Sequence, residues 1–251
     1  MSADAAGEET TEDLFLGEQL RLIQPRQGYR AGIDAALLAA AIGPLKPGAI
    51  VCEFGCGAGA ALFSAAVFEP DVRPIGVERD PSAAGLARRN AALNGVEARV
   101  EIVEADALSW KEGRGFDAVF ANPPWYAESE ITAPPQARRG AWIDEAGAGA
   151  WARAGLRALK PKGVLALIHT PQALPAILTA LEGGAGGIAV KPVAARPGRA
   201  ASRVIVRAVK GGRGAMQLLA PLILHEAGGG CGYTAEADAV LRGRARLALD
   251  G

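Results

Sequence analysis

The sequence predicts an α/β fold built on one mostly parallel β-sheet with helices on both faces. Three observations support this prediction. Short apolar segments rich in Val, Ile and Phe alternate along the chain with longer segments whose apolar residues recur at helical spacing. A glycine-rich loop, residues 55–59, follows one of the short segments and precedes a helical one. Half of the 251 residues are apolar, which is enough to bury the core of one domain of ordinary α/β size.

The first 13 residues are acidic and polar, so we expect a disordered tail followed by a single domain over residues 14–251. The start of the chain lacks the basic and apolar regions of a signal peptide. No later segment reaches the ~18 consecutive apolar residues that a membrane span requires. The sequence therefore favours a cytoplasmic protein with no membrane partner. After the tail, a short hairpin is expected over residues 20–31, around Pro25 to Gly28.

Seven segments have the length and composition of strands, and helical patterns separate most of them. The expected strands are residues 49–54, 74–78, 98–106, 116–121, 163–170, 187–195 and 202–210. The expected helices are residues 34–42, a segment that begins near residue 60, and residues 81–95, 145–160, 171–183 and 234–247. Asp34 is a candidate N-cap of the first helix, which Gly43-Pro44 would end. This alternation predicts three layers, because parallel strands need crossover connections that place helices over the sheet.

Charge is distributed unevenly along a chain whose formal net charge is zero. Residues 1–20 hold six acidic residues and no basic one, whereas residues 151–251 hold 14 Lys or Arg and five Asp or Glu. Such a chain can carry a basic face for nucleic acid, although a solvated arginine-rich surface is the alternative. The three cysteines, Cys52, Cys56 and Cys231, have neither a disulfide framework nor a metal-ligand spacing, so we expect no metal site.

The segment VCEFGCGAGA, residues 51–60, predicts a cofactor site at the carboxyl end of the sheet. Gly55, Gly57 and Gly59 allow the backbone to approach a ligand closely. The same loop fits the dinucleotide fingerprint, so a nicotinamide oxidoreductase is one interpretation. However, the loop contains no basic residue for a phosphate, and Glu53 just before it suits a cationic group. Glu78 ends the next strand and could accept hydrogen bonds from the ribose hydroxyls of either cofactor.

The segment FANPPW, residues 120–125, leaves the fourth expected strand through an Asn, two prolines and a large aromatic residue. An Asn-Pro turn is common in loops, but here it falls beside the predicted cofactor site. Pro123 and Pro124 have a fixed φ and no N–H, so their carbonyls are held rigidly. The Asn122 side-chain oxygen and the Pro123 carbonyl can accept the two N–H groups of a planar amine. Trp125 can stack on a base, a contact worth roughly 1–3 kcal/mol.

Together these motifs resemble those of class I S-adenosylmethionine-dependent methyltransferases. The pattern E-x-G-x-G-x-G at residues 53–59 resembles their first motif, and residues 122–125 resemble the Asn-Pro-Pro-aromatic motif of the amino-methyltransferases among them. The resemblance implies a Rossmann-like, doubly wound, seven-stranded sheet and S-adenosylmethionine as cofactor. It also implies that Glu53 holds the methionine end of the cofactor and that Asp106 contacts its adenine amino group.

A narrower resemblance selects one family. The segment QPRQGYRAGIDAALLAA, residues 24–40, resembles the opening of bacterial methyltransferases that modify adenine N6 next to the anticodon of a valine tRNA. It implies that Arg30, Gly32 and Asp34 cover the methionine end of the cofactor. The resemblance extends over about residues 14 to 247 and includes Tyr233-Thr234 before the last helix. Trp125 departs from it, because Tyr or Phe is usual there; the change preserves stacking and alters the size of the pocket.

A tRNA partner would need basic side chains for its phosphates, and an unpaired anticodon-loop base is easily turned out. The candidate contacts are Arg138, Arg139, Arg199 and Arg203. Enzymes that methylate guanine N2 of rRNA or adenine N6 of DNA remain open, as does an RNA-binding module without a cofactor. Glutamine N5-methyltransferases of release factors share the Asn122 motif, but normally carry a helical domain before the glycine loop, and only 52 residues precede Glu53 here. His169 and His225 are interpreted as structural, and a monomer is favoured over an oligomer.

Overall fold

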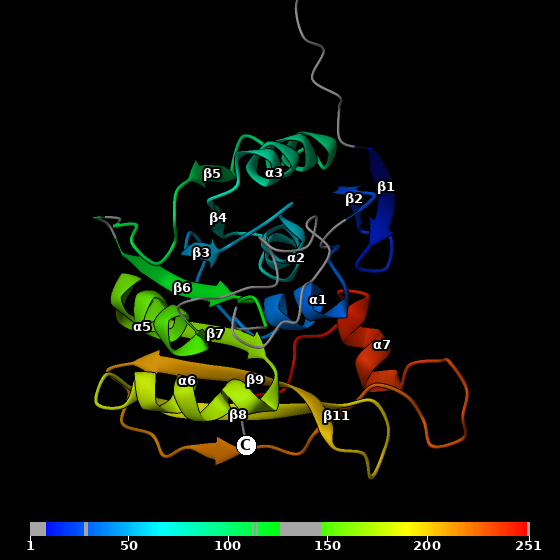
Figure 1. Ribbon diagram of the computed structural model, residues 1–251, viewed down its shortest axis with the longest axis vertical. Helices are drawn as coiled ribbons and strands as arrows, with labels where there is room; N and C mark the ends of the chain where they lie inside the picture. The colour runs from blue at the N-terminus through cyan, green and yellow to red at the C-terminus, as the bar shows by residue number, and fades with distance from the viewer. Residues whose placement is uncertain (1–8, 28–29, 112, 114, 126–146, 250–251) are drawn as a thin grey trace, which may run out of the picture.

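The computed structural model describes residues 9–27, 30–111, 113, 115–125 and 147–249. A mixed sheet forms its centre (Figure 1), with seven long strands in the order β5, β4, β3, β6, β7, β9, β8. In chain order these strands are β3 (Ile50–Phe54), β4 (Arg73–Glu78), β5 (Glu101–Glu104), β6 (Phe116–Ala121), β7 (Leu159–His169), β8 (Ala185–Ala194) and β9 (Ala201–Lys210). β9 runs antiparallel to both of its neighbours, and the other pairings in this order are parallel. The predicted doubly wound, mostly parallel sheet is confirmed. Two short strands, β10 (Gln217–Leu218) and β11 (Leu222–Ile223), extend it along β8.

Helices cover both faces of the sheet (Figure 1). One face carries α1 (Ile33–Ala39), α2 (Ala60–Phe68), α3 (Pro81–Leu93) and α7 (Ala235–Leu241). The other face carries α5 (Ala148–Ala158) and α6 (Leu174–Leu181), with the short 3₁₀ helix η3 (Pro171–Ala173) before α6. The three predicted layers are therefore present.

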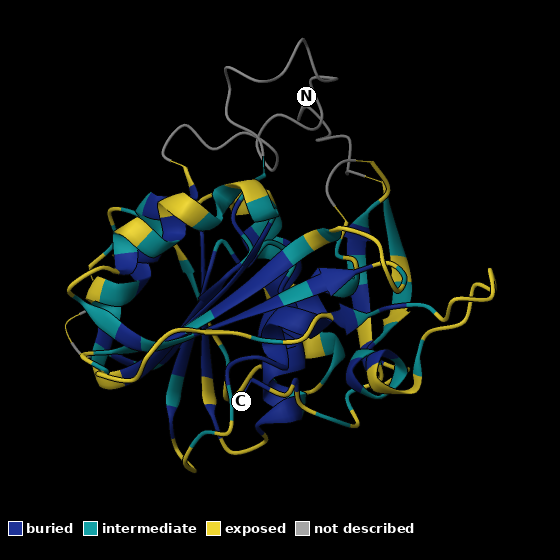
Figure 2. Cartoon of the chain, turned by 90° about the horizontal axis from the view of Figure 1, so that it is seen from below, coloured by how far each residue is buried: buried dark blue, intermediate teal, exposed yellow. Residues whose placement is uncertain are grey.

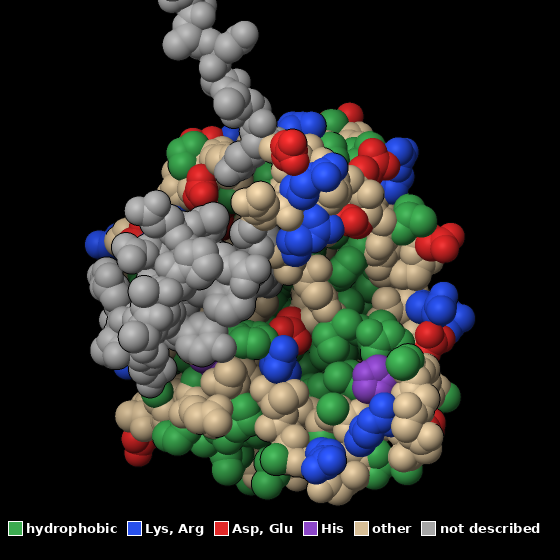
Figure 3. Space-filling model, turned by 45° about the vertical axis from the view of Figure 1, so that its right-hand side comes forward, with side chains coloured by type: hydrophobic (Ala, Val, Ile, Leu, Met, Phe, Trp, Pro, Cys, Tyr) green, Lys and Arg blue, Asp and Glu red, His purple; other side chains and the backbone are tan. Residues whose placement is uncertain are grey.

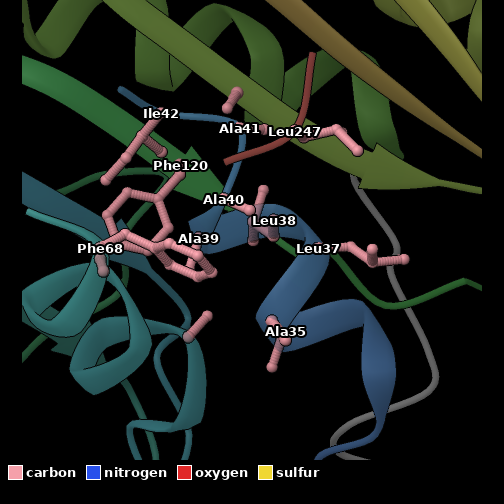
Figure 4. Packing of buried hydrophobic residues seen from close by; sticks show 14 of the residues in the cluster. Ala35, Leu37, Leu38, Ala39, Ala40, Ala41, Ile42, Phe68, Phe120 and Leu247 are labelled. Atoms are coloured by element: carbon pink, nitrogen blue, oxygen red, sulfur yellow. The ribbon is translucent and has the colours of Figure 1, made fainter. Parts of the chain in front are cut away.

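The pleat of β6 shows why the sheet needs helices on both sides. Ala118 and Phe120 belong to the apolar core under α1 and α2, whereas Val119 and Ala121 belong to the core under α5. All four side chains are buried because successive residues of a strand point to opposite faces. Figure 2 shows the same pattern along the central strands, which are buried while the outer sides of the helices are exposed. Figure 4 shows Leu37 and Leu38 of α1 in the same buried cluster as Phe120 and Leu247.

The expected tail and hairpin are placed differently in the structure. The hairpin pairs β1 (Thr10–Phe15) with β2 (Leu20–Pro25), so its turn is residues 16–19 rather than Pro25 to Gly28. The expected disordered tail of 13 residues is therefore wrong from Thr10 onward, and residues 1–8 lie outside the described part of the chain.

The acidic composition of β1 misled the prediction, because its charges are paired within the fold. Glu12 forms an ion pair with Arg21 of β2, and Asp13 forms one with Arg30. The apolar residues of the hairpin, including Leu20 and Leu22, are buried in the main core. The paired charges, together with the buried leucines, are sufficient to order this segment.

Several element ends also differ from prediction. α1 ends at Ala39 and α7 at Leu241, both earlier than expected, and β7 begins four residues early at Leu159. The N-cap of α1 is Gly32, not Asp34, because the Asp34 side chain pairs with Arg203 on β9 instead. None of the helices in the described part of the chain is long and apolar enough to cross a bilayer.

Candidate active site

Four neighbouring strands bring the predicted site residues to one edge of the sheet. β3 ends before Gly55, β4 ends at Glu78, β5 ends just before Asp106, and β6 ends before Asn122. Because β5, β4, β3 and β6 are adjacent and parallel, their carboxyl ends lie side by side. Ligands of open α/β sheets bind at this edge.

The glycine loop adopts a conformation that other residues would strain. Gly55, Gly57 and Gly59 have φ of 68°, 54° and 89°. A Cβ on Gly59 would lie 2.3 Å from the Phe63 ring, so this glycine permits close packing of the loop on α2. A Cβ on Gly57 would meet no described atom within 4 Å, so there is open space above the middle of the loop. The loop thus combines a fixed backbone with room for a ligand.

Glu78 holds the loop and remains available to a ligand. Its Oε2 accepts a hydrogen bond from the Gly57 N–H at 2.9 Å, and its Oε1 accepts one from the Asp80 N–H at 2.9 Å. A carboxylate has about four lone-pair sites, so hydrogen bonds from hydroxyl groups can be added. The prediction that Glu78 lies at the cofactor site is consistent with this position.

Glu53 is a buried carboxyl group with an unpaired oxygen. Its side chain is 4% exposed, and its Oε2 has no hydrogen-bond partner among the described residues. Burial raises the pKa of Glu53 well above its usual range, the Glu78 carboxylate raises this pKa further, and a backbone hydrogen bond from Leu62 opposes them. An unpaired buried carboxyl group fits a cationic ligand, which would repay the cost of its burial. Burial and the same two acids also raise the pKa of the Cys56 thiol, which keeps that thiol uncharged.

Asp106 makes contacts typical of a turn. Its Oδ1 accepts the Leu108 N–H at 3.0 Å, and its carbonyl accepts the Trp110 N–H at 2.8 Å. The side chain is exposed at the edge of the site. The implied contact with an adenine amino group therefore stays a prediction.

Asn122 and Trp125 are joined by a hydrogen bond. The indole Nε1–H of Trp125 donates to Asn122 Oδ1 at 3.2 Å. Pro123 between them is buried. The indole thus uses one of the two lone pairs of the oxygen that the sequence predicts as an acceptor for a substrate amine.

Trp125 is held on its other side by a charged pair. The Arg203 guanidinium lies over the Trp125 ring, with Cζ 4.0 Å from the centroid. Arg203 Nε also donates to both carboxylate oxygens of Asp34 at 3.1 Å. Burial raises the pKa of Asp34, and Arg203 partly offsets this rise. Arg203 thus contacts both Asp34 and Trp125, which the sequence did not indicate.

Arg30 and Gly32 have local contacts in the structure. Arg30 donates to the Pro25 carbonyl at 3.1 Å and pairs with Asp13, so it fastens the hairpin to the chain before α1. Gly32 is exposed at the N-cap of α1. The implied contacts of both residues with the cofactor remain predictions.

His169 is a site residue that the sequence interpretation missed. It ends β7, is 5% exposed, and its Nε2 lies 3.2 Å from the Pro124 carbonyl oxygen. The interpretation of His169 as part of the core is therefore incomplete. The only signal in the sequence was its place at the end of the strand that follows the one before Asn122.

Of the four candidate phosphate contacts, one is engaged inside the fold, one is exposed and two lie outside the described residues. Arg199 is exposed in the loop between β8 and β9, whereas Arg203 is committed to Asp34 and Trp125. Arg138 and Arg139 lie outside the described residues. In the C-terminal region, further basic side chains bond to protein groups: Arg196, Lys210, Arg242, Arg244 and Arg246. In the described ranges, no group of three His, Cys, Asp or Glu residues is arranged to hold a metal ion.

Comparison with known protein families identifies the family of this chain. The family model of the methyltransferase small domain matches residues 31–172, more than half of the chain. The chain belongs to this family. The match includes the glycine loop, Glu78 and the Asn122 segment, which are the elements that form the site.

The relatives of this chain include two kinds of methyltransferase. The tRNA1(Val) (adenine(37)-N6)-methyltransferase of Bacteroides thetaiotaomicron is 30% identical over 49% of this chain and 52% of its own length. The chain spans about half the length of this relative. The enzyme of the same name from Aeromonas hydrophila is 28% identical over 86% of this chain and 90% of its own length. A release factor glutamine methyltransferase of Chlorobaculum tepidum is 36% identical over 32% of this chain and 29% of its own length.

Solved structures agree with the fold. A predicted O-methyltransferase from Agrobacterium tumefaciens superposes with a TM-score of 0.70 at 29% identity, covering 85% of this chain and 97% of that one. M. jannaschii TYW2, solved in complex with AdoMet, superposes with a TM-score of 0.56 at 15% identity, covering 82% and 88% of the two chains. The second similarity shows the fold alone, which is that of class I methyltransferases.

Proposed function

We propose that this protein is an S-adenosylmethionine-dependent N-methyltransferase that acts on the N6 amino group of an adenine in tRNA. The observation that carries the proposal is the placement of Asn122 Oδ1 and two rigid prolines at the end of β6, beside the glycine loop that follows β3. This arrangement offers acceptors for an amine where a cofactor would lie.

The residues of the site fit S-adenosylmethionine. Glu53 provides the unpaired buried carboxyl group that suits an ammonium or a sulfonium, and Glu78 provides a carboxylate at the position suited to ribose hydroxyls. Open space lies above Gly57, whose N–H donates to Glu78. When bound, S-adenosylmethionine supplies a methyl group attached to a positively charged sulfur.

The chain itself contributes positioning and electrostatics. An adenine amine has a delocalised lone pair and no low pKa to exploit, so a general base alone would give little. Asn122 Oδ1 and the Pro123 carbonyl would accept its two N–H groups, direct the lone pair toward the methyl group, and stabilise positive charge as it develops on nitrogen. The nitrogen would gain the methyl group as the carbon–sulfur bond breaks and leaves a neutral thioether, and the nitrogen would then lose one proton to solvent.

Two observations support RNA as the substrate. The relative that aligns over 86% of this chain is named for tRNA adenine methylation. In addition, Tyr233 is 41% exposed and stacks on His225, with ring centroids 5.0 Å apart. Tyr233 lines a groove of about 350 Å³ together with Ile33 of α1. Figure 3 brings this side forward and shows hydrophobic side chains gathered among basic and acidic ones. Unpaired bases bind to such stacking surfaces.

A release factor glutamine is the alternative acceptor, because the release factor glutamine methyltransferase of C. tepidum is 36% identical over 32% of this chain. Its carboxamide is also a planar nitrogen that Asn122 could hold. The chemistry is the same, so only a direct test separates the two substrates.

Methyl transfer from labelled cofactor provides this test. The protein is incubated with S-adenosylmethionine carrying a tritiated methyl group and either unmodified bulk bacterial tRNA or a release-factor protein. We expect label in N6-methyladenosine after digestion of the tRNA to nucleosides. Label in glutamine alone would replace tRNA with protein as the substrate. No label in either acceptor, or no binding of the cofactor by calorimetry, would contradict the proposal.

A further inference from the structure

His169 lies beside the two prolines that follow β6, which have no backbone N–H to donate. The last register pair of β6 with β7 is Ala121 and Leu167, so two residues further along the strands Pro123 comes opposite His169. Two consecutive prolines provide no backbone N–H, so this segment cannot continue the ladder as a donor. Within the proline pair, only the carbonyl groups can form backbone hydrogen bonds. His169 supplies a side-chain donor to one of them, the Pro124 carbonyl at 3.2 Å.

The hydrogen bonds define the tautomer of the ring. A carbonyl oxygen can only accept, so His169 Nε2 carries the hydrogen that bonds to Pro124. His169 Nδ1 accepts the Thr170 backbone N–H at 2.8 Å, so it carries a lone pair. Both ring nitrogens are therefore used, and the ring is neutral in this arrangement. The Thr170 N–H at the end of β7 holds the Nδ1 edge of the ring, and the Nε2 edge bonds to the Pro124 carbonyl.

The bond from His169 to Pro124 determines which of the two proline carbonyls can accept a hydrogen bond from a substrate. His169 bonds to the Pro124 carbonyl, whereas no described residue donates to the Pro123 carbonyl. The second acceptor proposed for an amine is thus the proline carbonyl to which His169 does not bond. Asn122, one residue earlier, supplies the first acceptor.

We propose that His169 is a positioning residue for methyl transfer: its Nε2–H holds the Pro124 carbonyl and so fixes the Asn122-Pro123 acceptor pair. This inference rests on the proposed function for its catalytic consequence. Its structural part, the bond from Nε2–H to Pro124, stands on the geometry alone.

Ring nitrogen resonances test the structural part without any activity measurement. The chain has two histidines, and His225 offers the opposite case, because its Nδ1 lies 3.0 Å from the Gly232 carbonyl and must carry the hydrogen there. In the ¹⁵N-labelled full chain we expect His169 as the Nε2–H tautomer and His225 as the Nδ1–H tautomer, with His225→Gln assigning the signals. His169 found as the Nδ1–H tautomer would overturn the proposal.

Two amide substitutions test the catalytic part. His169→Gln can place an N–H near the position of Nε2, whereas His169→Asn has the same amide on a shorter side chain that does not reach Pro124. We expect kcat to fall about 10- to 100-fold in His169→Asn, as small misplacements of reacting groups do, and to stay within about threefold of wild type in His169→Gln. The Kd for S-adenosylmethionine and the Tm should be similar in both.

The outcomes are distinguishable. Equal turnover of the two variants, at equal Tm and cofactor affinity, would overturn the positioning role. If the wild-type protein methylates neither RNA nor protein, the proposed function fails, while the tautomer measurement still decides whether His169 holds Pro124. A variant that does not fold leaves the wild-type tautomer measurement as the deciding result.

Discussion

The Arg203 guanidinium lies over the ring of Trp125, with Cζ 4.0 Å from the ring centroid. The same guanidinium bonds to Asp34 of α1, so strand β9, helix α1 and the segment after β6 meet at one cation. A cation over the face of an indole is attracted by the ring quadrupole. One face of Trp125 is thereby covered, and a substrate base would stack on the opposite face.

Breaking the pair of Arg203 with Asp34 should cost stability. In Arg203→Met the buried Asp34 carboxylate loses its partner, and we expect the free energy of unfolding to fall by about 2 kcal/mol. The double variant with Asp34→Asn should recover part of this loss, because no unpaired charge is left. Denaturant unfolding of the wild-type protein, Arg203→Met, Asp34→Asn and the double variant measures the coupling between the two residues. Arg199→Met is the matched control at an exposed arginine. Additive effects of the two substitutions would contradict the pairing.

Trp125 should contribute to RNA binding through its ring rather than through its N–H. Trp125→Phe keeps a stacking face and removes the hydrogen bond to Asn122, so we expect RNA affinity close to that of wild type. Trp125→Ala should weaken binding by about 1–3 kcal/mol, the usual value for one base stacked on an aromatic side chain. Fluorescence anisotropy of a labelled anticodon stem-loop measures both. Equal losses of RNA affinity in the two variants would show that stacking on Trp125 does not contribute to binding.

Cofactor affinity should increase with pH because of Glu53. Burial, aided by Glu78, raises the pKa of Glu53 in the free protein, and a bound cation should lower it again. Below the raised pKa, binding must therefore release a proton from Glu53, so affinity rises with pH and levels off once Glu53 is ionised in the free protein. Calorimetry with S-adenosylmethionine across this range, in buffers of different ionisation enthalpy, reports the released proton. Glu53→Gln should bind more weakly and lose the contribution of Glu53 to the pH dependence. An unchanged pH dependence in this variant would show that Glu53 does not face the cation.

RNA affinity should fall steeply with salt if the basic residues contact phosphates. Each neutralised phosphate contributes about −0.7 to the slope of log affinity against log salt for a single strand. Arg199 is exposed in the loop after β8, so we expect Arg199→Ala to reduce the slope by about one contact. Filter binding from low to physiological salt measures this. A flat response in the wild-type protein would exclude a phosphate-based interface.

The sequence predicted the sheet and the site's local motifs because these depend on neighbouring residues. The glycines at 55, 57 and 59, and the Asn-Pro-Pro-Trp segment, fall at strand ends that apolar periodicity locates. The sequence did not predict the role of a side chain where that role depends on a distant partner. Asp34 looks like an N-cap until Arg203, 169 residues later, accounts for it. His169 looks like a core residue until Pro124 is placed beside it. The charges of β1 indicated disorder because their partners lie on β2 and beyond.

Turnover of Asn122→Ala tests the central claim most directly. If Asn122 Oδ1 accepts an N–H of the substrate amine as charge develops on nitrogen, its removal should lower kcat at least ~100-fold, as loss of one transition-state hydrogen-bond partner does elsewhere. Methyl transfer from S-adenosylmethionine to tRNA under saturating conditions measures kcat, and calorimetry checks that the variant still binds the cofactor. A large loss of kcat with intact cofactor binding is the predicted result. Turnover near that of wild type would contradict the account.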